Sequence, residues 1–325
     1  MRERDLIARI QSQFSDKSNF LLKGIGDDCA VFADSENSCW LISTDLLVED
    51  VHFVTDWHEP YILGRKSIAV NLSDIAAMGG QPHFILHSLV LPSHLSDQWL
   101  DRWHAGAQSM LDEFSCVLIG GDVSKGEQFA VNVVAIGSAH PKSVVYRSGA
   151  SAGQDVYVTG YLGSSAAGLE LLKKGHGPNS EYKDLIDAHL DPQPQVEIGL
   201  KLAEKGLASA MQDISDGIAT DLSHLCRESN ISAVVEAEKI PVDKLLIKQS
   251  FKTGLSALDF ALYGGEDYQL IFTSTPENGE ALQDLAKSTD TLITKIGKTH
   301  KGPTKVLLSE AGQMEDISYK GYEHI

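Results

Sequence analysis

Apolar segments with strand character alternate with longer helical segments along the chain, and this alternation constrains the fold more than any other feature. Residues 39–44 are predicted to form a strand, as are residues 129–137, where small and β-branched apolar residues recur at every second position. Residues 61–78 form a long apolar stretch that ends at a pair of glycines, which predicts a helix. The pattern indicates an α/β chain of the α+β type.

Two such series of segments are separated by a polar stretch rich in small residues, 140–153. The length of 325 residues also favours two domains over one. We therefore predict an N-terminal domain over residues 1–145 and a C-terminal domain over residues 146–325. Further strands are expected over residues 84–90, 116–119, 155–159, 268–273, 292–296 and 304–308, and further helices over 98–114, 164–172, 195–206, 217–227 and 277–287.

The charge balance is strongly acidic, with 27 Lys and Arg against 45 Asp and Glu and a formal net charge of −18. This argues against a general nucleic-acid binder and against an anionic membrane surface as partner. An acidic protein that handles phosphates needs positive charge from elsewhere, and divalent cations are the obvious source. The four cysteines form no C-x-x-C pair, and the N-terminus has no signal-peptide pattern, so the cytoplasm is the expected location.

Four short segments share one design, in which an apolar strand or a glycine-rich turn is followed by a carboxylate. They end at Asp28, Asp45, Asp122 and Asp213, and a fifth carboxylate, Asp74, lies in the apolar stretch 61–78. A carboxylate at the end of a strand is held rigidly but faces the loop side, where ligands bind. Mg²⁺ prefers oxygen ligands, and several carboxylates in one pocket repel each other unless cations neutralise them. Convergence of these segments would imply more than one metal ion.

Each acidic segment also has an ordinary structural interpretation. An Asp after Gly is a common turn residue, and Ser73 with Asp74 would suit the polar face of a helix. Asp213 and Asp216, three residues apart, also resemble an N-cap pair that opens the next helix. The hypothesis of a metal site therefore depends on the five features occurring together.

The glycine-rich turns exclude some nucleotide sites and leave others open. The sequence has no G-x-x-x-x-G-K-[ST] motif, and no G-x-G-x-x-G follows a strand in the first half. The stretch 157–168 predicts a strand, a turn and a helix, an arrangement that suits a phosphate at the helix N-terminus or simple packing of small residues. Arg147 and Lys125 lie in polar loops, where each could meet a phosphate or be solvated.

Taken in order, the motifs resemble the thiamine-monophosphate kinase family of the aminoimidazole ribonucleotide synthetase-like superfamily. The motifs that carry the resemblance are Gly24-Ile-Gly-Asp-Asp28, Ser43-Thr-Asp45, Val51-His-Phe53, Ala69-Val-Asn-Leu-Ser-Asp-Ile-Ala-Ala-Met-Gly79, Gly120-Gly-Asp122, Arg147-Ser-Gly149, Val158-Thr-Gly160, Ser165-Ala-Ala-Gly168, Asp213-Ile-Ser-Asp-Gly217, Gly264-Gly-Glu-Asp-Tyr268 and Lys320-Gly-Tyr322. They cover nearly the whole chain in a specific order.

The resemblance implies an enzyme of thiamine diphosphate biosynthesis that transfers phosphate from ATP to thiamine monophosphate. The transfer would be direct and in line, assisted by several Mg²⁺ ions, with no phosphorylated enzyme. The N-terminal domain would bind ATP and Mg²⁺ and would pair with a second copy into a barrel-like core of a homodimer. The C-terminal domain would complete the active site.

The resemblance also implies roles for individual residues. The catalytic residues would be Asp45, Asp122 and Asp213. The metal ligands would be Asp28, Ser43, Thr44, Asp45, Asp74, Asp122, Asp213 and Asp216, with Asp27 as a second choice. The ATP contacts would be Gly121, Asp122, Arg147 and Ser215. The substrate contacts would be His52, Glu266 and Tyr322.

Two positions depart from the family pattern. Asp50 stands where glycine is common and would alter the loop that holds His52, and Gln195 stands where arginine is common. Selenophosphate synthetase is an alternative within the superfamily, but no cysteine precedes Cys29, which weakens that alternative. A non-catalytic nucleotide- or metal-binding protein with the same fold is the alternative from a different class.

Overall fold

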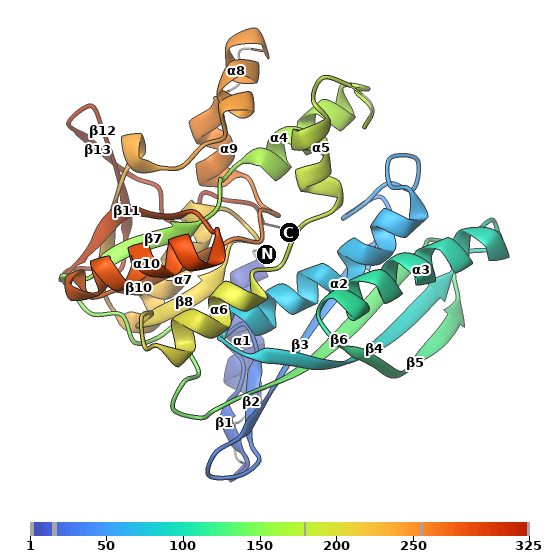
Figure 1. Cartoon of the computed structure of the whole chain (residues 1–325), viewed down its shortest axis with the longest axis horizontal. Helices are drawn as coiled ribbons and strands as arrows, with labels where there is room; N and C mark the ends of the chain where they lie inside the picture. Colours follow the sequence, from blue (N-terminus) through green and yellow to red (C-terminus); the bar gives the residue numbers. More distant parts are fainter. Residues whose placement is uncertain (1–2, 15–17, 179, 254–255, 324–325) are drawn as a thin grey trace.

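The computed structural model describes residues 3–14, 18–178, 180–253 and 256–323, and its strands form two sheets that belong to different parts of the chain (Figure 1). The first sheet has the strand order β1-β2-β3-β6-β4-β5. Its strands are β1 Leu21–Lys23, β2 Ala30–Ala33, β3 Cys39–Val48, β4 Gln81–Leu91, β5 Val117–Lys125 and β6 Ala130–Ala139. Neighbouring strands are antiparallel except β4 and β5, which are parallel.

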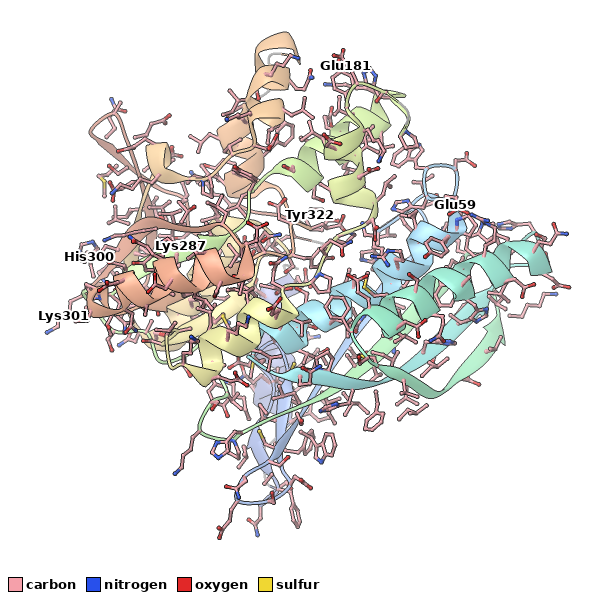
Figure 2. All side chains as sticks on the ribbon, viewed as in Figure 1. Glu59, Glu181, Lys287, His300, Lys301 and Tyr322 are labelled. Carbon is pink, nitrogen blue, oxygen red and sulfur yellow. The ribbon has the colours of Figure 1, made fainter. Side chains whose placement is uncertain are left out.

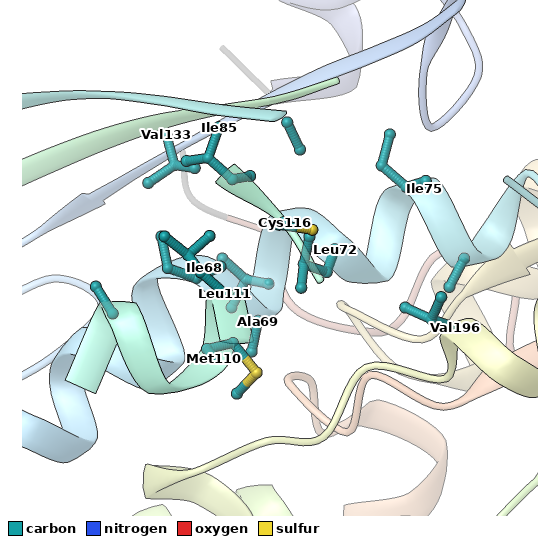
Figure 3. Close-up of a cluster of buried hydrophobic side chains, with 14 of the residues drawn as sticks. Ile68, Ala69, Leu72, Ile75, Ile85, Met110, Leu111, Cys116, Val133 and Val196 are labelled. Atoms are coloured by element: carbon teal, nitrogen blue, oxygen red, sulfur yellow. The ribbon is translucent and has the colours of Figure 1, made fainter. Parts of the chain in front are cut away.

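Two helices, α2 (Pro60–Ala77) and α3 (Asp97–Glu113), cover one face of this sheet (Figure 1). Their backbones approach closely at Gly106, where a Cβ would lie 1.8 Å from the carbonyl oxygen of Tyr61. Between helices and sheet lies a core that includes Ile68, Leu72 and Ile85, and Figure 3 shows these side chains packed together. The predicted helices 61–78 and 98–114 are thus confirmed.

Helix α2 is buried on nearly all sides, because its other side packs against the C-terminal part of the chain. Figure 3 shows Val196, from the next domain, beside the helix end that carries Ile75. A helix surrounded by protein is normally apolar all round, yet α2 also buries Lys66, Asn71 and Ser73. Buried polar side chains require partners, and these partners define the site described below.

Strand β5 corrects one prediction. The sequence predicts that this strand ends at Gly120-Gly121, but the strand continues through both glycines to Lys125. Gly121 is needed for close packing and not for a turn, since a Cβ there would lie 1.9 Å from the carbonyl oxygen of His87 on β4. All nine residues of β5 are exposed, including Val117, Ile119 and Val123, and the strand forms an edge of the sheet.

The second sheet has the order β13-β12-β9-β11-β7-β10-β8 and has helices on both faces. Its strands are β7 Asp155–Thr159, β8 Ala210–Asp213, β9 Ser232–Glu236, β10 Leu270–Ser274, β11 Ile293–His300, β12 Val306–Glu310 and β13 Gln313–Asp316. Strands β12 and β9 are parallel, and the other neighbours are antiparallel.

The remaining helices are α1 Glu3–Gln13, α4 Ser164–Lys173, α5 Lys183–Leu190, α6 Val196–Glu204, α7 Ile218–Ser229, α8 Lys244–Thr253, α9 Ala257–Tyr263 and α10 Gly279–Thr289. Helices α6 and α10 pack on one face of the second sheet, where Tyr157 stacks on Phe272. Helix α7 packs on the other face, against Val158 and Ile271. None of the described helices is both long enough and apolar enough to cross a membrane.

Candidate active site

Three carboxylates from distant parts of the chain meet between the two sheets. Asp28 precedes β2, Asp74 lies in the last turn of α2, and Asp213 ends β8. One oxygen from each lies within 4.8 Å of the others. We call Asp28, Asp74 and Asp213 the acidic cluster. The sequence placed these residues in separate segments, and the structure brings them together.

The carboxylates of Asp45 and Asp216 border the acidic cluster closely enough to act on its charges. Burial raises the pKa of Asp213 to about 6, and Asp45 and Asp216 add to that rise. Burial likewise raises the pKa of Asp28 to about 7, with contributions from Asp213 and Asp27. The pKa of Asp74 is raised well above its ordinary value by burial and then by Asp45. Without added cations, these acids therefore keep their protons to a higher pH than ordinary aspartates do.

Helix α2 positions two members of this group through its buried polar side chains. Ser73 donates its hydroxyl to Asp213 Oδ2 at 2.5 Å, and Asn71 Oδ1 accepts from the backbone N–H of Asp45 at 3.0 Å. The hydroxyl of Ser43 lies 3.5 Å from the carbonyl oxygen of Asn71. The expectation that Ser73 and Asp74 occupy a polar surface of the helix is wrong, because this part of α2 faces the second domain.

Arg147, in the connection between the domains, is the cation that pairs with the acidic cluster. Its guanidinium forms an ion pair with Asp28, with Nε 3.1 Å from Oδ1, and its backbone N–H donates to Asp27 Oδ1 at 3.0 Å. Lys23 forms an ion pair with the second oxygen of Asp27 at 3.2 Å. Asp27 thus has a cation beside its second oxygen, although that oxygen accepts no hydrogen bond from the described residues, and Asp28, which lies with Asp74 and Asp213, is the better candidate ligand.

The acidic cluster fits a hard divalent cation. Asp28 Oδ2 is fully buried and has no hydrogen-bond partner among the described residues. A buried carboxylate oxygen without a partner is costly, and a cation would satisfy it. The donor atoms of the cluster are all carboxylate oxygens, the ligand type that Mg²⁺ prefers. Metal binding here would displace the protons that burial holds on the carboxylates.

Other predicted ligands point elsewhere or lie too far away. Thr44 is exposed and its hydroxyl bonds with Asn132 and the carbonyl of Val133, because adjacent residues of a strand face opposite sides. Gly121 and Asp122 lie on β5, three strand spacings of about 4.8 Å from Asp45 on β3. The structure therefore does not bring Asp122 to the acidic cluster of its own chain.

The loop 214–217, which follows Asp213, is held against the turn that contains Glu266. The backbone N–H of Glu266 donates to Ser215 O at 2.8 Å, and that of Tyr268 donates to Ile214 O at 2.9 Å. Asp221 of α7 holds the loop from the other side by accepting the backbone N–H of Asp216 at 3.1 Å. The predicted ATP contact Ser215 and the predicted substrate contact Glu266 are thus neighbours.

Glu266 lies in a group of buried polar residues. Lys66 Nζ lies 3.0 Å from Glu266 Oε2, and Nδ1 of His189 lies 3.0 Å from the same oxygen. Although burial alone would raise it, the pKa of Glu266 is lowered by the Lys66 amine and the His189 ring. Sequence reasoning missed Lys66 and His189. A lysine in the middle of a long apolar helix was the available signal.

The other two predicted substrate contacts come from different parts of the chain. Tyr322, labelled in Figure 2, has an exposed side chain, and its backbone N–H donates to Asp216 O at 3.0 Å. His52 lies in the turn after β3, where its Nδ1 accepts the backbone N–H of Val48 at 2.9 Å. Asp50 in this turn has φ +64°, a left-handed conformation that Asp tolerates better than most residues. Asp50, which stands where the family commonly has glycine, therefore adopts the backbone conformation that the turn requires.

The strand–turn–helix stretch at 157–168 is not a free phosphate site. Asp267 accepts the backbone N–H groups of Gly163 and Ser165, at 2.7 and 3.3 Å, so a carboxylate already occupies the N-terminus of α4. The second departure, Gln195, precedes α6 and donates its side chain to the carbonyl of Gln193 at 2.8 Å. This contact is local, between residues two apart in the chain.

Comparison with known proteins places this arrangement in a family. The model "AIR synthase related protein, N-terminal domain" matches residues 26–139, and its C-terminal counterpart matches residues 151–309. The thiamine-monophosphate kinase of Haemophilus influenzae is 34% identical over 328 residues, which cover 100% of this chain and 98% of the relative. That of Bacillus subtilis is 35% identical over 308 residues, or 93% of each chain. A solved structure, AaThiL complexed with AMPPCP and TMP, has a TM-score of 0.87 at 33% identity and covers 100% of this chain and 97% of that one.

Proposed function

The chain belongs to the thiamine-monophosphate kinase family, and we propose that it transfers the terminal phosphoryl group of ATP to thiamine monophosphate, giving ADP and thiamine diphosphate. The observation that carries the proposal is the acidic cluster. It places a buried carboxylate oxygen, which accepts no hydrogen bond from any residue that the structure describes, beside two further carboxylates at the junction of the domains. A solved relative of the same fold is complexed with AMPPCP and TMP, which supports the pairing of a nucleotide with this acceptor.

In the proposed mechanism, Asp28, Asp74 and Asp213 would hold Mg²⁺, with Asp45 and Asp216 as further ligands. Bound Mg²⁺ supplies positive charge that neutralises the phosphate oxygens of both substrates. The nucleophile is an oxygen of the acceptor phosphate, which is ionised at neutral pH, so no strong general base is required. Arg147 would bind an ATP phosphate beside Asp28. The side chains therefore position the reacting groups, and no covalent phospho-enzyme forms.

The remaining contacts stay proposals of the same kind. Gly121, Asp122 and Ser215 would contact ATP, and His52, Glu266 and Tyr322 would contact the acceptor. The proximity of Ser215 to Glu266 supports this division, because it places the two groups of contacts on adjoining loops. The location of Asp122 outside the acidic cluster supports a role that involves a second copy of the chain.

We also propose a homodimer formed through the first sheet. Strand β5 has a free edge and exposes apolar residues on both faces, a surface that proteins normally cover. Pairing of two such sheets would produce the barrel-like core expected from the sequence. The four cysteines are free and buried, which fits the cytoplasm as the proposed location. The domain boundary between residues 145 and 146 is part of the same proposal.

An ADP-release assay on the purified chain tests the function. Thiamine monophosphate, with ATP and Mg²⁺, should stimulate ADP release well above the rate with ATP alone, and EDTA should abolish the stimulation. A panel of other phosphorylated acceptors serves as the control for acceptor identity. Equal stimulation by unrelated acceptors, or none by thiamine monophosphate, would contradict the proposal. Trapping a phosphorylated aspartate or histidine during turnover would contradict the mechanism.

A further inference from the structure

A buried amine on α2 lies apart from the acidic cluster and has no part in the mechanism above. Lys66 is 0% exposed, and its Nζ lies 3.0 Å both from Glu266 Oε2 and from the carbonyl oxygen of His189. His189 is itself buried and places Nδ1 3.0 Å from the same carboxylate oxygen. One carboxylate of the C-terminal domain is therefore bound by a lysine of the N-terminal domain and by a histidine of α5.

Stability alone is a weak reason to keep this lysine. A buried ion pair is often no more stabilising than apolar residues of the same volume, because removing both charges from water is unfavourable. The neighbours of Lys66 on α2 include fully buried Leu63 and Ile68, so an apolar side chain would suit the same position. A functional role explains the buried lysine better than stability does, and its partner Glu266 indicates what that role is.

Glu266 has the features of a ligand-binding group. Its side chain is 24% exposed, unlike the two buried residues that bind it, and both contacts go to Oε2. Its backbone has φ +62° and that of Tyr268 has φ +49°, so the turn adopts a conformation unusual for these residues. Strained turns of this kind persist when surrounding contacts determine them, and they are enriched at functional sites.

The turn is joined to the acidic cluster by backbone contacts. The N–H of Glu266 donates to Ser215 O in the loop that follows Asp213, and Lys66 lies on the helix that also carries Asp74. The acceptor carries its phosphate at one end and a cationic ring system with an amino group at the other. A carboxylate in this turn can therefore meet the ring system while the phosphate lies at the cluster.

We propose that Lys66 and His189 are positioning residues that hold the Glu266 carboxylate in place for the cationic end of the acceptor. The proposal rests on the proposed function, in which Glu266 contacts thiamine monophosphate. Lys66 and His189 bind Oε2, so Oε1 is the oxygen that meets the ligand. Their loss should weaken binding of the acceptor and leave binding of ATP nearly unchanged.

The experiment measures KM for thiamine monophosphate and for ATP separately, together with the melting temperature, in four variants. Lys66→Met and Glu266→Gln should each raise KM for the acceptor at least about tenfold and change KM for ATP by less than about twofold. Lys66→Met/Glu266→Gln should bind the acceptor no more weakly than Glu266→Gln alone, because Lys66 acts only through Glu266. Lys201→Met, which removes a surface lysine paired with Glu197, is the matched control and should change neither KM.

His189 gives an independent test with a conservative substitution. His189→Asn keeps a side-chain N–H near the place of Nδ1 and should retain more acceptor binding than His189→Ala. If Lys66→Met does not fold, the double variant, which leaves no unpaired buried charge, and the His189 pair decide the question. A multiplicative loss in the double variant, or an equal effect of His189→Asn and His189→Ala, overturns the proposal.

The controls distinguish failure of the positioning role from failure of the proposed function. If wild-type protein shows no ADP release with thiamine monophosphate, or Glu266→Gln binds the acceptor normally, the proposed function or the role of Glu266 has failed. If wild type is active and Glu266→Gln is impaired, but Lys66→Met binds the acceptor normally, only the positioning role has failed. Equal increases in both KM values for Lys66→Met would also contradict it.

Discussion

The acidic cluster and the Lys66–Glu266 pair each take one residue from α2, Asp74 and Lys66, but their charges are balanced in opposite ways. In the cluster, burial and mutual repulsion raise the pKa of Asp28, Asp74 and Asp213. The positive charge of Arg147 lowers these pKa values, but by less than burial and repulsion raise them. In the pair, the pKa of Glu266 is lowered because a buried lysine supplies the counter-charge. One region is built to receive cations from solution, and the other is complete without them.

The largest expected effect on activity comes from removing a negative charge beside the acidic cluster. Asp45→Asn should lower kcat by at least about 10²–10³-fold, because it removes a proposed metal ligand while keeping the shape of the side chain. Steady-state ADP release at low and high Mg²⁺ measures the effect. Asp284→Asn, which changes an exposed residue of α10, is the control. Normal activity of Asp45→Asn at both Mg²⁺ concentrations would show that Asp45 is not a ligand.

The second prediction compares the stability effects of one substitution in each region. Glu266→Gln leaves Lys66 buried without a counter-charge and should reduce the free energy of unfolding by about 3–5 kcal/mol. Asp213→Asn relieves repulsion and should leave the melting temperature unchanged or higher in EDTA. Differential scanning calorimetry in Mg²⁺-free buffer measures both. A loss of stability for Asp213→Asn as large as that for Glu266→Gln would remove the distinction between the regions.

The third prediction concerns pH. An acid whose pKa is raised in the folded state binds more protons when folded than when unfolded. Its contribution to stability without Mg²⁺ therefore falls as the pH rises from the ordinary pKa of an aspartate to the folded-state pKa, which is about 7 for Asp28. Mg²⁺ competes with those protons, so its stabilising effect should grow over the same range. The difference in melting temperature with Mg²⁺ and with EDTA should therefore be several degrees larger at pH 8 than at pH 5.5 (about 2–4 °C for each kcal/mol). A pH-independent difference would indicate that the cluster is ionised before metal binds.

The smallest effect is expected at Asp50, in the turn that holds His52. Asp50→Gly suits the left-handed backbone but loses the contact of Asp50 Oδ2 with Gln128, at 3.2 Å, so stability should change by less than about 1 kcal/mol. Asp50→Val should reduce stability by about 1–3 kcal/mol, because a β-branched residue is strained there. Urea denaturation of both variants measures this. A larger loss for Asp50→Gly than for Asp50→Val would show that the backbone conformation is not the controlling factor.

The sequence predicted the features that depend on local pattern. Long apolar segments predicted α2 and the strands on either side of it. The position of Asp28 and Asp213 after a turn or a strand predicted them as candidate ligands. The sequence did not predict α5, α8 and α9, which are short and pack mainly against each other and α4. Their stability comes from tertiary contacts, which local pattern does not encode.

The residues of the site also differ in whether local sequence pattern or tertiary contact reveals them. Asp74 and Asp213 could be proposed as ligands in advance because several acidic segments occur together and in the order of the family's motifs. Lys66 has an ordinary helical position, and its importance appears only when Glu266, two hundred residues away, folds onto it. Asp122 illustrates the opposite case. Its motif predicted a ligand of the cluster, but strand order separates it from Asp45 by two intervening strands.

If two copies pair through the edge strand β5, the activity of the protein would depend on its concentration. Gly121 and Asp122 lie on the surface that a second copy would cover, so pairing would change the surroundings of two proposed ATP contacts. The affinity of the chain for itself and its affinity for nucleotide would then be linked, each strengthening the other by the same factor. Specific activity would depend on the total concentration of the chain, and ATP would act as an assembly factor as well as a substrate.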